Sequence, residues 1–151
     1  MVTAEAITRS VQTFWAAGFS ASATVYPGQQ ADTSALEEWV ELWIESWEEA
    51  VRRDASPHIV RVNVTVHCFS RSATAATRVQ ELADAARDVL ARQTIVIRDY
   101  DESGTPVLGH VRLREAEMHD MTRPQGAEHR GVLRHAVVAI NGRAESLAEA
   151  I

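Results

Sequence analysis

The fold is decided by the stretch HIVRVNVTVHCFS, residues 58–70, in which apolar and polar side chains alternate. One face of this segment would carry Val60, Val62, Val64, Val66 and Cys68, and the other Arg61, Asn63, Thr65 and His67. An alternation of period two over so many residues predicts a β-strand that is buried on one side only. The strand therefore needs an apolar layer against its valine face.

The segment 73–93, ATAATRVQELADAARDVLARQ, supplies that layer. Its apolar residues recur at steps of three and four, which predicts an amphipathic helix: Ala75, Val79, Leu82, Ala83, Ala86, Val89 and Leu90. The valine face and this apolar stripe each remain in water unless they pack together. We therefore expect them to form two halves of one core.

Length and composition indicate one compact domain spanning residues 1–151, since 46% of the 151 residues are hydrophobic. The net charge of −6, from 21 acidic and 15 basic residues, argues against a protein whose main task is to grip nucleic acid. No run approaches the roughly 20 apolar residues of a membrane span, and the N-terminus lacks a secretory signal. We expect an intracellular protein without a membrane partner, in which Cys68 is a small buried hydrophobe.

The remaining segments complete an α+β pattern. Residues 3–17 form an apolar stripe of helical period, and residues 143–151 are compatible with a short terminal helix. Short or alternating strand patterns occupy residues 23–28, 94–100, 109–121 and 131–142. The expected fold is a mostly antiparallel sheet that contains a long hairpin and is packed by an N-terminal and a central helix.

Residues 35–53, ALEEWVELWIESWEEAVRR, fit two structures. As a helix, the segment has a capping box formed by Ser34 and Glu37, and its tryptophans recur at steps of four. As a strand, it places Val40, Leu42 and Ile44 on one face and Trp39, Glu41, Trp43, Glu45 and Trp47 on the other. The turn at Ala55-Ser56-Pro57 and the strand that follows favour an antiparallel hairpin.

A search for catalytic and metal-binding motifs gives none. The six histidines form no HxH or HExxH pattern, and no CxxC pair accompanies them. The sequence also lacks a GxSxG nucleophile turn and a glycine-rich phosphate loop. We therefore predict no catalytic residue, no metal and no cofactor, and interpret the glutamates of residues 37–49 as a solvated face.

Three tryptophans within nine residues, Trp39, Trp43 and Trp47, have two interpretations. Burial beneath the first helix is one. In the extended structure, however, they share a face with Glu41 and Glu45, and such a mixture of aromatic and acidic groups suggests a surface that contacts another subunit.

The order of these segments resembles that of the tail terminator, or head-tail joining, proteins of long-tailed bacteriophages. The resemblance rests on a strand that ends in Tyr26-Pro27-Gly28, on Glu38-Trp39-Val40 opening a long strand, and on VRVNVTVHCFS, residues 60–70, followed by ELADAARDVLARQ, residues 81–93. The segments 109–121 and 132–142 lie where that family has its remaining strands. The likeness covers nearly the whole chain in architecture and includes no catalytic signature.

The resemblance implies a non-enzymatic ring, usually a hexamer, at the tail-neck junction of the virion, assembled in the host cytoplasm. Its partners would be further copies of itself, the tail tube protein and the head-tail connector or stopper protein, with DNA passing through a central channel without specific binding. We expect Trp39, Trp43, Trp47, Arg52 and Arg53 at subunit or partner interfaces. Acidic groups would repel DNA from the channel wall, and the candidates are Glu41, Glu45, Asp99, Asp101 and Glu102.

Three other functions remain open. Another phage neck component, such as a tail completion or stopper protein, shares the size and fold class. A small enzyme or ligand-binding domain would use His67, His119 or His135 in a deep pocket. A bacterial adaptor unconnected with phages would bind a partner through the tryptophan face.

Overall fold

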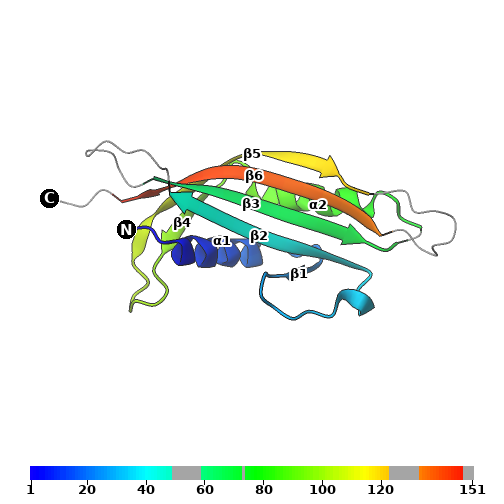
Figure 1. The fold of residues 1–151 in the computed structure, drawn as a ribbon, viewed down its shortest axis with the longest axis horizontal. Coiled ribbons are helices and arrows are strands. Elements are labelled where there is room, and N and C mark those ends of the chain that lie inside the picture. Colours follow the sequence, from blue (N-terminus) through cyan, green and yellow to red (C-terminus); the bar gives the residue numbers. More distant parts are fainter. Residues whose placement is uncertain (49–58, 73, 123–132, 148–151) are drawn as a thin grey trace.

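The structure is a computed structural model in which residues 1–48, 59–72, 74–122 and 133–147 are described. These residues form two α-helices, one short 3-10 helix and a six-stranded curled sheet (Figure 1). The elements in chain order are α1 (Ala4–Gly18), β1 (Ala23–Val25), η1 (Thr33–Ala35), β2 (Glu38–Glu48), β3 (Ile59–Ser70), α2 (Arg78–Leu90), β4 (Thr94–Arg98), β5 (Val107–Asp120) and β6 (Arg134–Ser146). The fold is α+β, as predicted.

The sheet has the order β1-β2-β3-β6-β5-β4. Its long strands pair antiparallel, and only the short β1 pairs parallel with β2. The C-terminal strand β6 lies between β3 and β5, so the segment at 58–70 is central in space as well as in the chain. Both described α-helices pack on the face of the sheet that carries the core, and no other α-helix occurs in the described ranges to cover the opposite face.

The ambiguous segment 35–53 is a strand wherever it is described. β2 pairs with β3 in continuous antiparallel register from Glu38↔Ser70 to Glu48↔Val60. Val40 and Leu42 are fully buried, because the extended backbone turns them toward the valines of β3. The capping box of the helical alternative is not formed at Ser34, whose backbone N–H and hydroxyl both donate to the carboxylate of Asp32, the N-cap residue of η1. Cross-strand burial therefore outweighs the helical spacing of the tryptophans.

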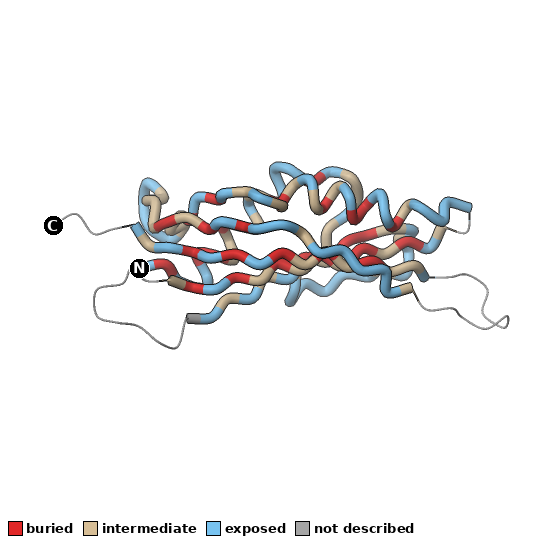
Figure 2. Tube along the Cα trace, turned by 90° about the horizontal axis from the view of Figure 1, so that it is seen from above, coloured by how far each residue is buried: buried red, intermediate tan, exposed pale blue. Residues whose placement is uncertain are grey.

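The core lies between one face of the sheet and both helices. Its largest fully buried side chains include Trp15 and Ile7 of α1, Leu82 and Leu90 of α2, and the valines of β3. Buried and exposed residues alternate along the strands (Figure 2). Cys68 lies in this core as predicted, and burial raises the pKa of its thiol to about 12.

Most element boundaries differ from the prediction by a few residues, and the two largest differences concern α2 and β6. α2 begins at Arg78 instead of residue 73. β6 continues through Ser146, into the segment predicted as a terminal helix, because Ala144 is buried and pairs with both Val60 and Val111. Residues 148–151 of that predicted helix lie outside the described part of the chain. No helix within the described ranges is long and apolar enough to cross a membrane.

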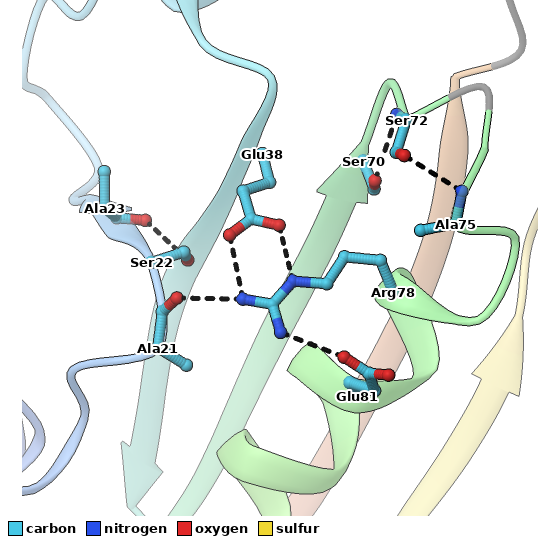
Figure 3. Close-up of polar contacts among 9 residues, drawn as sticks. All are labelled: Ala21, Ser22, Ala23, Glu38, Ser70, Ser72, Ala75, Arg78 and Glu81. Atoms are coloured by element: carbon cyan, nitrogen blue, oxygen red, sulfur yellow. Dashed lines mark hydrogen bonds and ion pairs between the residues drawn. The ribbon is translucent and has the colours of Figure 1, made fainter.

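Arg78 anchors the first turn of α2 to the sheet (Figure 3). Its guanidinium donates two hydrogen bonds to the carboxylate of Glu38, at 2.6 and 2.8 Å, and one to the carbonyl oxygen of Ala21 at 3.2 Å. A further bond of 3.0 Å goes to Glu81. This contact lowers the pKa of Glu38, chiefly through the hydrogen bonds from Arg78. It fixes the helix against the start of β2, on the covered side of the sheet.

Candidate partner-binding face

The face of the sheet opposite the helices, called here the open face, carries the side chains that alternate with the core residues. Trp43 and Trp47 of β2 lie on it and are 44% and 48% exposed. Large aromatic groups at such exposure are typical of surfaces that bind other proteins. Two of the three predicted interface tryptophans are therefore placed where a partner can reach them.

Trp39 differs from the other two tryptophans. It shares their side of β2 but is only 4% exposed, because its ring stacks on Phe69 at a centroid distance of 5.0 Å. The guanidinium of Arg71 covers it, 4.7 Å from the ring centroid. Arg71 is itself held by the carbonyl oxygens of Thr33 and Leu36. The sequence placed Trp39 with Trp43 and Trp47 at a subunit or partner interface, whereas its burial makes it part of the monomer's own packing.

One row of paired residues across the open face is strongly basic. Trp47 pairs with Arg61, Arg61 with Arg143, and Arg143 with Arg112. The row ends at Thr94, which pairs with Arg112 on the other side. Three consecutive strands, β3, β6 and β5, therefore place arginine at directly opposed positions. We call these three residues, Arg61, Arg143 and Arg112, the arginine row.

A fourth guanidinium, that of Arg114, lies beside the arginine row, because Arg114 is two residues after Arg112 on the same face of β5. The register between β5 and β6 shifts between Leu113 and Ala116, so β5 has one extra residue at this point. Arg114 lines a hollow of about 480 Å³ together with Trp47, Arg61, Asn141 and Arg143. A smaller hollow of about 190 Å³ adjoins it through Arg143 and is lined by Arg112 and Glu145.

At the other end of the open face two histidines meet. Nδ1 of His67 lies 2.8 Å from Nε2 of His135, and the His135 ring stacks on Phe69 at a centroid distance of 4.4 Å. Burial lowers the pKa of His135, the positive charge of His67 lowers it further, and Glu41 and Asp120 oppose this effect. His119 is on the same row, since both it and His67 pair with Val137. Of the three histidines proposed for the alternative ligand site, His67 and His135 are in contact, and His119 is separated from His67 by the intervening strand β6.

The five predicted channel acids fall into two separate groups. Glu41 and Glu45 project from β2 on the open face, beside Trp43 and Trp47. Asp99, Asp101 and Glu102 lie in the turn between β4 and β5, where Asp101 accepts a 2.7 Å bond from Arg9 of α1. That turn is therefore on the helix side of the sheet, and the two groups do not form one surface. Arg52 and Arg53 lie outside the described residues.

The arginine row was missed in the sequence because its members come from three segments whose register is set only by folding. The three segments contribute Arg61, Arg143, and Arg112 with Arg114, and no local pattern links one segment to another. Within the described ranges, no group of three or more histidine, cysteine, aspartate or glutamate side chains is placed to hold a metal ion. The open face can therefore contact a partner through the charges of its arginines and the rings of its exposed tryptophans.

Comparison with known proteins supports the fold alone. No protein-family model matches the chain, and no curated protein sequence matches it. The chain is similar to a solved structure whose name describes no function, with a TM-score of 0.69 and 11% sequence identity. The alignment covers 99% of this chain and 100% of that one, so the whole architecture recurs in another protein.

Proposed function

We propose that this protein is a structural tail terminator of a long-tailed bacteriophage. In this role, copies of the chain form a ring, with six subunits expected, that caps the tail tube, stops its elongation and joins it to the head connector. The ring encloses a channel through which DNA passes. The protein acts in the virion at the tail-neck junction, after assembly in the host cytoplasm.

The observation that carries the proposal is the division of the sheet into two faces. Both helices and the core occupy one face, and the other presents Trp43, Trp47 and the arginine row to solvent. Tryptophan and arginine are the residue types most enriched among those that dominate the binding energy of protein interfaces. A small domain whose described residues leave such a face exposed is suited to assembly with other proteins.

The order of elements adds support. The sequence resembles the terminator family in a first helix, a short strand, a long hairpin, a central helix and further strands, and the described fold has these elements in that order. A closed ring requires two different patches on each subunit, so that one patch meets the other patch of the next copy. The arginine row on the open face and the surface around α1 and the β4–β5 turn are two such patches, chemically unlike each other.

The five acidic residues predicted to line the channel lie on two separate surfaces, so only one of the two groups is assigned to the channel here. A single surface of each subunit lines the bore of a ring, so Glu41 and Glu45 cannot readily share it with Asp99, Asp101 and Glu102. We assign the channel role to Glu41 and Glu45, whose carboxylates would repel the phosphates of passing DNA.

Deleting the gene in the phage tests the function. We expect overlong tail tubes that lack heads, seen by negative-stain electron microscopy, because nothing would stop tube polymerisation or offer a joining surface. Supplying the protein from a plasmid should restore tails of normal length. A deletion that leaves tube length normal but prevents head joining would instead indicate a stopper or completion protein, and normal virions would refute both.

A further inference from the structure

We propose that a hollow beside β2 binds an arginine side chain of a partner protein, and that Glu41 and Trp43 recognise it. The hollow lies between β2 and the turn at residues 26–29, called here the Tyr26 turn. The proposal rests on the function proposed above, in which this chain joins other proteins of the tail and neck. It names the chemistry of one such contact.

The hollow exists because β1 ends early. β1 pairs in parallel with the first part of β2 and ends beside Glu41 (Figure 1). The chain then turns away, since the N–H of Gln29 donates to the carbonyl oxygen of Tyr26 at 3.1 Å. Gly28 has a φ of +84° in this turn, a conformation that favours glycine. The chain therefore leaves the edge of β2, and a space remains beside the strand.

The size of this space suits one side chain. It measures about 210 Å³ and is lined by residues 25–29 together with Glu41 and Trp43. Binding sites for free small molecules are usually larger, with volumes of roughly 300–1,000 Å³. Trp43 and Gly28 are exposed, so the hollow is accessible from solvent. A long side chain on the surface of another protein can therefore enter it.

The walls supply two groups that recognise a cation. The indole of Trp43 is 44% exposed, and tryptophan is the side chain whose ring face attracts cations most strongly. Glu41, half-buried on the same face of β2, brings a carboxylate. Among the described residues this carboxylate has no ion pair or hydrogen bond, and it acts on His135 only through its charge. A positive charge in the hollow would therefore gain from both walls.

Arginine fits these walls better than lysine does. Its planar guanidinium can lie against an indole ring and donate two parallel hydrogen bonds to a carboxylate, whereas lysine offers a compact, strongly hydrated point charge. Phosphates and other anions are disfavoured, because Glu41 would repel them. Glu45 lies on the same face further along β2 and adds to that repulsion.

The arginine is assigned to another protein and not to a second copy of this chain. Most arginines in the described ranges already contact groups of their own chain, for example Arg9, Arg71 and Arg78. Moving one of these into a neighbouring copy would break a contact in the copy that donates it. The net charge of −6 also favours a basic partner. A bound arginine neutralises Glu41, so Glu45 then keeps the channel role alone.

Nuclear magnetic resonance of the ¹⁵N-labelled full chain tests the hollow with a defined probe, N-acetylarginine amide, at pH 8, where free histidine is uncharged. The indole N–H signal of Trp43, identified by its absence in Trp43→Thr, and the backbone N–H signal of Gly28 should shift together and saturate. We expect a Kd on the order of millimolar. N-acetylcitrulline amide, which has a similar shape without the charge, should cause no saturable shift.

Glu41→Gln should weaken binding of the arginine probe by about two- to fivefold, because it keeps the shape of the side chain and removes its charge. Glu117→Gln is the matched control, since Glu117 also lies on the open face and its side chain is 77% exposed. It should leave binding unaltered. Equal binding of the citrulline probe, or equal affinity of Glu41→Gln and the wild type, would overturn the proposal. So would shifts centred on Trp47 while the Trp43 and Gly28 signals stay in place.

Sedimentation velocity of the wild-type chain, with and without N-acetylarginine amide, identifies the source of the arginine. The probe should leave the sedimentation unchanged, because the hollow is not a contact between copies. Dissociation of self-associated chains by the probe would assign the arginine to a second copy and overturn the choice of partner.

The proposed function is judged separately, by tube length in the deletion phage. A probe that does not bind, together with overlong tubes after deletion, would remove this site and leave the terminator role intact. Binding of the probe, together with normal virions after deletion, would remove the terminator role and leave the arginine site.

Discussion

The rings of His67 and His135 meet edge to edge across β3 and β6, with Nδ1 of one 2.8 Å from Nε2 of the other. Two ring nitrogens at this distance form a hydrogen bond only when one carries a proton and the other does not. Protonation of both rings would place two positive charges in contact. The pair therefore connects the stability of the sheet to pH.

We predict that the free energy of unfolding falls as the pH drops from about 7 to about 5. Burial and His67 lower the pKa of folded His135 below its ordinary value of 6.5, so the unfolded chain takes up this proton first. The stability is full above pH 6.5 and declines progressively below it, until the pH reaches the folded pKa. Urea unfolding at a series of pH values measures the slope.

Replacing His135 by phenylalanine, which can still stack on Phe69, should flatten this dependence. His119→Gln is the matched control, because it also removes a histidine from the sheet but at a side chain that is 60% exposed. An unchanged slope in His135→Phe would show that other groups cause the effect.

Arg78→Met should destabilise the fold by roughly 1–3 kcal/mol, since it leaves Glu38, whose side chain is 29% exposed, without its charged partner. The pKa of Glu38 is lowered from 4.5, so this contribution is present above that pH and disappears as the pH falls through the folded pKa. The variant and the wild type should therefore converge in acid. Arg87→Met, at a more exposed ion pair, should cost under about 1 kcal/mol. Equal losses in both variants would contradict the anchoring role of Arg78.

The tryptophans should separate into structural and binding residues. Trp39→Ala should cost about 3–5 kcal/mol, because it removes a buried ring stacked on Phe69. Trp43→Thr and Trp47→Thr should change stability by about 0.5 kcal/mol or less, since both positions are exposed strand sites. Both should nevertheless reduce capping of tail tubes in phage complementation. Full complementation by the two threonine variants together would argue against the open face as a partner surface.

Gly109 should be intolerant of any side chain. A methyl group there would overlap the backbone carbonyl oxygen of Glu145 on β6, and the side chain of Val2 is also close. Gly109→Ala should therefore cost at least about 1–3 kcal/mol and separate the start of β5 from β6. Gly104→Ala tests a different effect, because that position has open space but a φ of +82°. It should cost about 1–2 kcal/mol from backbone strain alone. Thermal unfolding compares the two variants.

The local pattern of the sequence determined much of the fold. Alternation at residues 58–70 and a helical stripe after it correctly predicted β3, α2 and their common core, because burial of an apolar face depends on periods that the chain itself carries. The prediction that β2 is a strand depended on the turn and the strand that follow it in the sequence, since an isolated segment of that composition also fits a helix. The sequence did not determine how the β2–β3 pair continues into a larger sheet, because that depends on the order of strands, in which β6 lies between β3 and β5.

The candidate site was decided by tertiary structure. The tryptophan spacing was visible in the sequence, but burial of Trp39 under Arg71 depends on a contact between residues far apart in the chain. The arginine row exists because three strands align Arg61, Arg143 and Arg112, and Arg114 lines the hollow beside it. Periodicity fixes which way a side chain faces relative to its own strand. The register between strands, which depends on the packing of the whole sheet, determines which residues of the neighbouring strands lie beside that side chain.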